Sequence, residues 1–250
     1  MNNNIKLRAI VLKEINKGES NKQVIVLTKE HGKMLLSATG AKNTKSKFLA
    51  GTQLFSYCDF FVTEKKGYYY ISEIDLIENF YNIRLDIQKL SYSIYFLDLI
   101  EKTAFNGMEC DEILELLLRT LFFLSKKDYD INLAARVFEL KYLQFSGYML
   151  ETKQCISCGK IPQKINYFTA NGGGLLCQKC KEKAFDAISI SAGALKAVEF
   201  VMYSDIKNIF QFQVSDFVLK ELKTICDKCI KNYINLKFET LEFAESLDKL

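Results

Sequence analysis

Two cysteine pairs constrain this chain more than any other feature of its sequence. Each pair has CxxC spacing, and 18 residues lie between the two pairs. Four thiols with this spacing are typical of zinc ribbons, because two residues between the cysteines let both sulfurs of a pair reach one metal ion. The sequence therefore predicts one structural Zn²⁺ ion; reduced thiols or a redox pair are the alternatives. The predicted ligands are Cys155, Cys158, Cys177 and Cys180.

A four-thiolate zinc site is closed: it leaves no coordination position for water or substrate, so its expected role is to hold structure. The residues between the pairs agree with a ribbon. Residues 165–169 predict a short strand, and the glycine-rich residues 171–174 predict the turn that follows it.

The other cysteines and the single histidine do not complete a second site. Cys226 and Cys229 lie within an expected amphipathic helix without a matching pair, and we interpret them, with Cys58 and Cys110, as buried apolar residues. His31 falls in a predicted turn, where an exposed position is expected. No GK[ST] phosphate loop or strand-GxGxxG-helix unit occurs. We therefore expect a protein that is not an enzyme.

Length and composition indicate an ordinary globular protein. The chain has 250 residues, of which 49% are hydrophobic and 26% charged. It shows neither the pattern of a signal peptide nor an 18-residue apolar run, so no membrane association is expected. Eight cysteines in such a chain favour a reducing compartment, and we expect a cytoplasmic protein.

Charge is distributed unevenly along the chain. Residues 1–50 carry ten Lys and Arg against three acidic residues, whereas residues 51–150 carry ten against fifteen. Residues 151–185 carry six against two. Basic ends around an acidic middle suggest a polyanionic partner, although a run of lysines is often only a solvated surface.

The first third of the chain predicts a small barrel. Period-2 alternation and branched residues favour strands, which are separated by short turns and by one longer basic loop between the third and fourth strands. Five such strands fit an OB-fold barrel, the type that binds oligonucleotides. The expected strands are residues 5–15, 24–28, 34–38, 55–63 and 68–75.

From residue 82 the apolar spacing becomes helical. Helices are expected from residue 83 to 104, from 113 to 124, from 132 to 147, from 191 to 201 and from 216 to 234.

Particular residues in these helices have expected roles. Asn132, Ser191 and Ser215 are the predicted N-caps. Arg119, Arg136 and Lys141 are interpreted as exposed helix charges.

The fold class is therefore α+β and multidomain: a five-stranded OB-fold barrel followed by an α-helical domain with an inserted zinc-ribbon-like module. We expect the barrel in residues 1–79, the helical domain in residues 80–150 and 186–250, and the zinc module in residues 151–185.

A basic barrel with surface aromatics favours binding of single-stranded nucleic acid, since lysines contact phosphates and aromatic rings stack on bases. The loop with Lys42, Lys45 and Lys47 is the strongest candidate, because a flexible basic loop on a rigid barrel suits capture of the phosphate backbone. Phe48, Tyr57, Tyr68 and Tyr70 are candidate stacking residues, with core packing as the alternative. The candidate DNA-binding residues are Arg8, Lys13, Lys22, Lys33, Lys42, Lys45 and Lys47.

Several segments together resemble the bacterial RecO family of recombination mediators. Residues 9–13, 18–19, 26–33 and 40–48 are similar to its N-terminal barrel. Residues 138–148 and the CxxC pairs with Gly173 and Gly174 are similar to its helical and zinc-bearing region. Where the family often has Lys-Gly-Ala-Arg, this chain has Thr39-Gly-Ala-Lys42, with one basic charge fewer.

The resemblance implies a protein that binds single- and double-stranded DNA, anneals complementary strands and, with RecR, helps load RecA onto DNA coated by single-strand-binding protein. It also implies contact with the C-terminal tail of that coating protein and a location at the nucleoid. Some relatives lack the cysteines, which favours a structural role for zinc. An RNA-binding or RNA-processing factor with the same parts is the alternative, since stacking and phosphate contacts serve both nucleic acids. A protein-interaction module is the third interpretation of the sequence.

Overall fold

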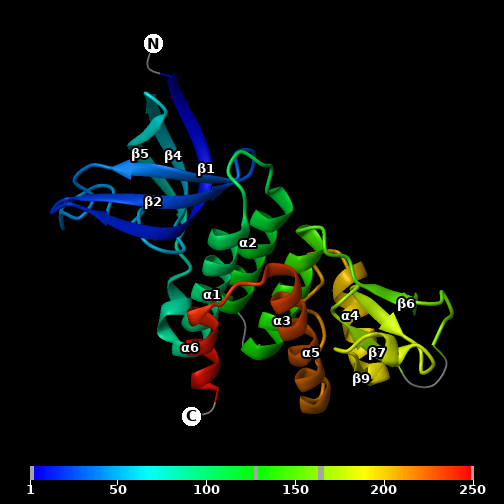
Figure 1. Cartoon of the computed structure of the whole chain (residues 1–250). Coiled ribbons are helices and arrows are strands. Elements are labelled where there is room, and N and C mark those ends of the chain that lie inside the picture. The colour runs from blue at the N-terminus through cyan, green and yellow to red at the C-terminus, as the bar shows by residue number, and fades with distance from the viewer. Residues whose placement is uncertain (1–2, 127–128, 163–165, 249–250) are drawn as a thin grey trace. The chain divides into compact units, whose positions relative to one another are not determined.

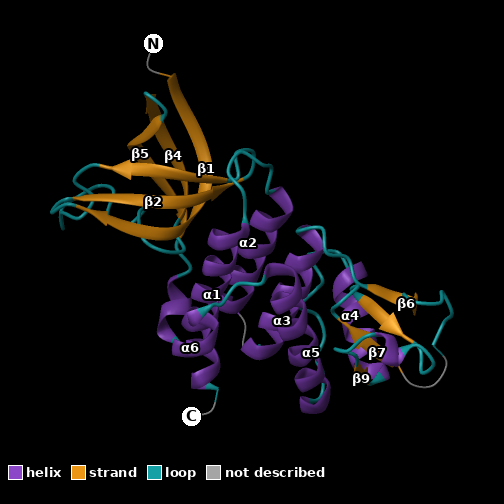
Figure 2. Cartoon of the chain, in the orientation of Figure 1, coloured by secondary structure: helices purple, strands orange, loops and turns teal. Residues whose placement is uncertain are grey.

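The structure is a computed structural model that describes residues 3–126, 129–162 and 166–248. Its contacts divide the chain into two compact units, residues 1–127 with 238–250, and residues 128–237. Figure 2 shows the strands in orange and the helices in purple.

Five strands of the first unit close into a barrel in the order β1-β2-β3-β5-β4 (Figure 1). All neighbouring strands are antiparallel except β3 and β5, which are parallel. The expected five-stranded barrel is confirmed. Its strands are β1 (Asn3–Lys17), β2 (Asn21–Thr28), β3 (Lys33–Ala38), β4 (Tyr57–Lys65) and β5 (Tyr68–Glu78).

The barrel core follows from alternation along the strands. Leu7 and Ala9 of β1 are buried, while Lys6 and Arg8, on either side of Leu7, are exposed. Because successive side chains of a strand point to opposite faces, this alternation places one set in the core and the other in solvent. The basic residues of β1 therefore lie on the outside of the barrel.

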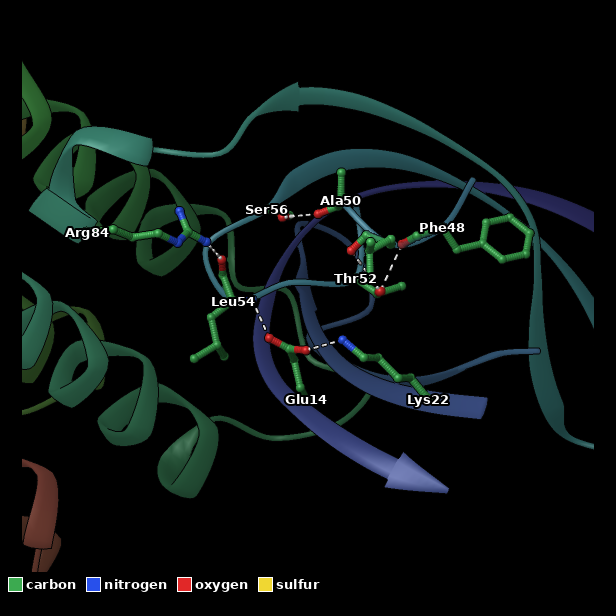
Figure 3. A network of polar contacts seen from close by, with 9 residues as sticks. Glu14, Lys22, Phe48, Ala50, Thr52, Leu54, Ser56 and Arg84 are labelled. Atoms are coloured by element: carbon green, nitrogen blue, oxygen red, sulfur yellow. Dashed lines mark hydrogen bonds and ion pairs between the residues drawn. The ribbon is translucent and has the colours of Figure 1, made fainter. Parts of the chain in front are cut away.

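The loop between β3 and β4, residues 39–56, is a series of hydrogen-bonded turns. The carboxylate of Glu14 accepts from the backbone N–H of Leu54 at 3.0 Å and from Nζ of Lys22 at 2.5 Å, as Figure 3 shows. Nη2 of Arg84 donates to the carbonyl of Leu54 at 2.7 Å. The hydroxyl of Ser56 donates to a carbonyl within the same loop. The loop is thus held at its C-terminal half, after Lys42, Lys45 and Lys47, and the flexibility expected from the sequence stays a prediction.

The first unit also contains three α-helices and a 3₁₀ turn among the residues described. The last helix, α6, packs against α1, where the hydroxyls of Thr240 and Tyr92 donate to Asp98 and Asp248. The apolar spacing had not predicted α6. These elements are η1 (Tyr81–Leu85), α1 (Ile87–Thr103), α2 (Asp111–Lys126) and α6 (Glu239–Leu247).

The α1–α2 loop pairs with the β2–β3 turn. Gly32 forms an isolated β-bridge with Asn106, and the N–H of Gly107 donates to the carbonyl of His31 at 2.9 Å. Gly32 has φ of 60°, and a Cβ there would lie 2.4 Å from the carbonyl oxygen of Phe105. Only glycine fits this close approach.

The second unit combines helices with a four-stranded sheet of order β6-β8-β7-β9. The helix α5 continues into a π-helical turn, η3 (Ile230–Ile234). The helices are α3 (Ile131–Phe145), α4 (Ala192–Tyr203) and α5 (Asp216–Cys229), and the strands are β6 (Glu151–Cys155), β7 (Asn166–Thr169), β8 (Gly174–Leu176) and β9 (Ile188–Ile190).

Two details of the helices differ from expectation. The N-cap of α3 is Asp130, which accepts from the N–H groups of Asn132 and Leu133, so the prediction of Asn132 as the cap was wrong. Arg136 and Lys141 are 1% and 4% exposed, so their interpretation as surface charges was also wrong. Each is buried with partners that offset the cost of burial: Arg136 pairs with Glu139 at 3.1 Å on the same helix and with Asp227 at 3.3 Å, and Lys141 donates to backbone carbonyls.

Ser191 and Ser215 cap α4 and α5 as predicted. No helix among the described residues is both long enough and apolar enough to span a membrane. The two compact units do not correspond one to one with the predicted barrel, helical domain and zinc module. The division into these three domains therefore stays a prediction.

Candidate metal centre and nucleic-acid interface

The four cysteines of the CxxC pairs converge on one point of the second unit. Their sulfur atoms all lie within 4.8 Å of one another. Sγ of Cys158 and Sγ of Cys177 are 3.8 Å apart. A tetrahedral ion with Zn–S bonds of about 2.3 Å requires sulfurs about 3.8 Å apart. The cluster therefore has the size and the donor set for one metal ion.

The backbone around the cluster favours thiolates. Burial raises the pKa of the Cys155 thiol, but the N–H groups of Cys177, Ser157 and Cys158 donate to its sulfur and lower the pKa to about 6. At Cys158 the N–H of Lys160 acts in the same direction, but desolvation and hydrogen bonds with the other thiols prevail and raise the pKa to about 11. Metal binding requires deprotonated thiols, so it would release any proton that the cluster holds.

The fold around the cluster holds the cysteines in place. Cys155 ends β6 and Cys177 follows β8, and these two strands are paired. Gly174 has no room for a Cβ, which would lie 2.7 Å from the carbonyl of Glu151. The predicted strand is confirmed as β7 over residues 166–169, while residue 165 lies outside the described residues. The glycine-rich segment therefore brings β8 against β6, where the sequence had indicated only a turn.

Asp186 closes the turn after β7. Its carboxylate accepts from the hydroxyl of Thr169 at 2.5 Å and from the N–H groups of Ala170 and Asn171 at 2.9 and 3.2 Å. Burial alone would raise the pKa of Asp186, but these hydrogen bonds lower it. Sequence reasoning missed this residue, because nothing local distinguishes it from a surface aspartate.

Three of the seven basic candidates on the barrel pair with a carboxylate. Arg8 pairs with Asp59 at 2.7 Å, Lys13 with Glu101 at 3.3 Å, and Lys22 with Glu14 at 2.5 Å. The ammonium of Lys33 donates to the backbone carbonyl of Glu101. The Arg8 and Lys6 side chains in turn hold the pKa of Asp59 well below its usual range. A phosphate at Arg8, Lys13 or Lys22 would have to compete with a carboxylate.

The three lysines of the 39–56 loop form no ion pair with a described carboxylate. Nζ of Lys42 donates to the carbonyl of Gly18 at 3.2 Å, and Nζ of Lys47 donates to that of Ser72 at 3.1 Å. Within the described ranges, none of Lys42, Lys45 and Lys47 pairs with a carboxylate. The loop therefore offers uncompensated positive charge beside the β1–β2 turn and beside β5.

The candidate aromatic residues separate into two groups. Tyr68 and Tyr70 on β5 are 61% and 40% exposed, with the buried Ile71 next to them on the opposite face. Phe48 and Tyr57 are half-buried, and Nζ of Lys47 lies 5.1 Å from the ring centroid of Phe48. Of these four candidates, Tyr68 and Tyr70 are the two with enough exposed ring surface to stack on a base.

A groove of about 520 Å³ lies between β1, β4 and α2 of the first unit. Lys6 and Lys29, which sequence reasoning did not select, line it together with Arg8. Asp59 pairs with Lys6 and Arg8, and Asp111 pairs with Lys29, at 2.7 to 3.0 Å. Glu30 and Glu115 also line the groove, so its acidic groups outnumber its cations. The groove is therefore not a site of free positive charge.

The remaining cysteines and the histidine lie as predicted. Cys58, Cys110, Cys226 and Cys229 are buried, and burial raises the pKa of each thiol. His31 is exposed in the β2–β3 turn.

Comparison with known proteins covers almost the whole chain. Residues 1–80 match the family described as "Recombination protein O N terminal", and residues 84–242 match "Recombination protein O C terminal". The chain is 35% identical to the "DNA repair protein RecO" of Acetivibrio thermocellus over 248 residues, 99% of each chain. It is 31% identical to the protein of the same name from Alkaliphilus metalliredigens, over 97% of this chain and 99% of the relative. With its barrel, its helices and its four-cysteine cluster, the chain belongs to the RecO family of DNA repair proteins.

Proposed function

We propose that this protein is a recombination mediator that binds single- and double-stranded DNA, anneals complementary strands and, with RecR, helps load RecA onto DNA coated by single-strand-binding protein. Family membership supports the role in DNA repair. The observation that carries the DNA-binding step is the uncompensated charge of Lys42, Lys45 and Lys47 on an anchored loop of the barrel. RecR, the tail of the coating protein and, indirectly, RecA are the proposed protein partners, at the nucleoid in the cytoplasm.

The mechanism makes and breaks no covalent bond. Two complementary strands repel each other through their phosphates, and bound lysines displace counterions and reduce this repulsion. Exposed Tyr68 and Tyr70 add stacking that does not depend on sequence. We assign Zn²⁺ to the four cysteines, where it would fix the β6–β8 end of the second unit and supply no chemistry.

The test compares two triple variants. Lys42→Ala/Lys45→Ala/Lys47→Ala is expected to weaken binding to all oligonucleotide sequences alike. It should also reduce the slope of log K against log salt by about 2, from roughly 0.7 for each lost single-strand phosphate contact. The matched control Lys196→Ala/Lys207→Ala/Lys220→Ala removes the same charge from the second unit. Fluorescence anisotropy at four salt concentrations measures both, and an unchanged slope in the loop variant would reject the assignment.

Annealing is measured with two labelled complementary oligonucleotides, first bare and then coated with single-strand-binding protein, without added nucleotide. Acceleration in both cases supports an ATP-independent mediator. Equal affinity for RNA together with a covalent change in either nucleic acid would instead support the RNA-processing alternative.

A further inference from the structure

Two Asn-Gly pairs occur in the sequence, Asn106-Gly107 and Asn171-Gly172. Both pairs are exposed, and both glycines have positive φ, 75° and 112°. An asparagine followed by glycine is prone to lose its side-chain amide, because glycine has no side chain to shield its backbone nitrogen. The two pairs therefore share one intrinsic reactivity, and the fold decides which of them reacts.

The reaction is a deamidation that needs water as its sole co-reactant. The glycine nitrogen attacks Cγ of the asparagine, so that an N–Cγ bond forms and the Cγ–Nδ2 bond breaks. The amide nitrogen leaves as ammonia and takes with it the proton of the glycine N–H. Water then opens the cyclic imide at either of its two carbonyls, which leaves aspartate or isoaspartate. A free glycine nitrogen beside a free side-chain amide is therefore the structural requirement.

The nitrogen of the first pair is engaged. The N–H of Gly107 donates to the carbonyl of His31 at 2.9 Å, and Asn106 pairs with Gly32 in an isolated β-bridge. Both contacts join the α1–α2 loop to the β2–β3 turn. The loop must open before the Gly107 nitrogen can attack, and the free energy of this opening slows the reaction.

The nitrogen of the second pair is free. Within the described part of the chain, neither the N–H of Gly172 nor the side-chain amide of Asn171 forms a hydrogen bond. The backbone around the pair is held nonetheless. The N–H of Gly173 donates to the carbonyl of Ala170 at 3.1 Å, and the N–H of Asn171 donates to Asp186 at 3.2 Å. The nucleophile and the amide thus lie at an exposed turn where no hydrogen bond of the glycine nitrogen has to break first.

We propose that Asn171 is a site of spontaneous deamidation, at which a neutral amide becomes a carboxylate. The pairing of Gly107 with His31 protects Asn106 from the same reaction. This modification needs no enzyme, and it is independent of the proposed role in recombination.

The product changes the turn in two ways. Its carboxylate adds a negative charge beside Asp186, which already accepts from the N–H groups of Ala170 and Asn171, and like charges repel. Isoaspartate also lengthens the backbone of the turn by one carbon. The turn continues into Gly173, whose carbonyl accepts from the N–H of Glu151 at 2.8 Å. Deamidation therefore loosens the contact between β6 and β8.

That contact positions two of the four clustered cysteines. Cys155 ends β6, and Cys177 follows β8. A looser β6–β8 contact should let these sulfurs move apart, so that the cluster holds its metal less tightly. Deamidation of Asn171 would thus weaken metal retention as the protein ages.

The experiment incubates the full-length, zinc-loaded protein in warm, mildly alkaline buffer and follows both pairs by peptide mass mapping. Isoaspartate is identified in the same peptides by labelling with an isoaspartyl methyltransferase. Asn171 should deamidate at least about 10-fold faster than Asn106, because hydrogen bonds of the α1–α2 loop must break before Gly107 can react. In urea, where neither turn is folded, the two rates should be similar. A rate ratio in the folded protein no larger than that in urea overturns the site at Asn171.

Gly32→Ala tests the protection of Asn106. The added Cβ would lie 2.4 Å from the carbonyl oxygen of Phe105 and displace the loop. Deamidation of Asn106 should rise about 10-fold, while that of Asn171, in the other compact unit, should not change. An unchanged rate at Asn106 overturns the protective role of the pairing.

The effect on the cluster is tested with the product residue itself. Asn171→Asp introduces the new charge, and Asn106→Asp is the matched control in the first unit. Transfer of zinc to a chelator should be about 5-fold faster in Asn171→Asp than in the parent, from the repulsion of two carboxylates a few ångströms apart in water. The control should release zinc as the parent does. Equal release from the two variants overturns the link between Asn171 and the cluster.

Discussion

Lys141 brings a positive charge into the interior of the second unit, and its replacement by Met should destabilise that unit. The ammonium group donates to the carbonyls of Val201, Met202 and Ser204 at 3.1, 3.2 and 3.0 Å. These carbonyls lie at the C-terminal end of α4, where the helix leaves its last carbonyls without helical partners. A cation at this end also interacts favourably with the helix dipole.

Met retains most of the length of the lysine side chain, so the change chiefly removes the donor. Hydrogen bonds to a charged group contribute more than neutral ones, and a buried carbonyl without a donor costs about 1–3 kcal/mol. Some of that cost is recovered, because one of the three carbonyls is only partly buried. We expect Lys141→Met to lower the free energy of unfolding by about 3 kcal/mol, which corresponds to a fall in Tm of about 6–12 °C.

Urea unfolding followed by circular dichroism gives the change in stability of the zinc-loaded protein. Hydrogen exchange at the amides of α4 shows whether the loss is local to this helix. Lys220→Met, at an exposed position on α5, is the matched control and should change stability by less than about 0.5 kcal/mol. A loss below about 1 kcal/mol in Lys141→Met would refute the reasoning, since it would mean that water replaces the ammonium group at no cost.

Three further changes test other parts of the structure. Cys177→Ser should abolish stoichiometric zinc binding, measured by plasma mass spectrometry, and loosen the second unit; a stable, metal-free and active variant would contradict the structural role. Gly32→Ala should destabilise the first unit by about 2 kcal/mol or more in thermal unfolding, because its Cβ would lie 2.4 and 2.7 Å from two carbonyls of the α1–α2 loop; an unchanged Tm would show that the loop can move aside. Asp59→Asn should be less stable than the parent at pH 7. Because Arg8 and Lys6 lower the folded pKa of Asp59, its stabilisation is present above the ordinary carboxyl pKa and disappears as pH falls through the folded value. Unfolding curves of the two proteins should therefore converge in acid, and a constant difference across pH would contradict this linkage.

Local patterns in the sequence predicted much of the fold. Alternation of side chains along β1 and β2 is a property of neighbouring residues, and it indicated the barrel strands within a few positions of the observed ends. The CxxC spacing indicated the four-cysteine cluster for the same reason: two residues between cysteines determine how closely the sulfurs of one pair approach. Ser191 and Ser215 were predictable as N-caps because a cap bonds to N–H groups only two or three residues away.

The candidate DNA-binding residues show where local reasoning fails. Arg8 lies 51 residues from Asp59, and Lys13 lies 88 residues from Glu101. No local pattern distinguishes these paired cations from Lys45, which has no acidic partner among the described residues. Charge counts along the sequence therefore overstate the positive surface of the barrel.

By itself, the sequence determined the strands, most of the helices and the four cysteines that cluster, because each depends on residues close together in the chain. The tertiary structure alone decided that Arg136 and Lys141 are buried and that α6 packs on α1. It also decided which lysines lack a carboxylate partner among the described residues. Those outcomes depend on residues that meet only after folding, since a buried charge needs partners such as Asp227 for Arg136 and the α4 carbonyls for Lys141, which lie far away in the sequence.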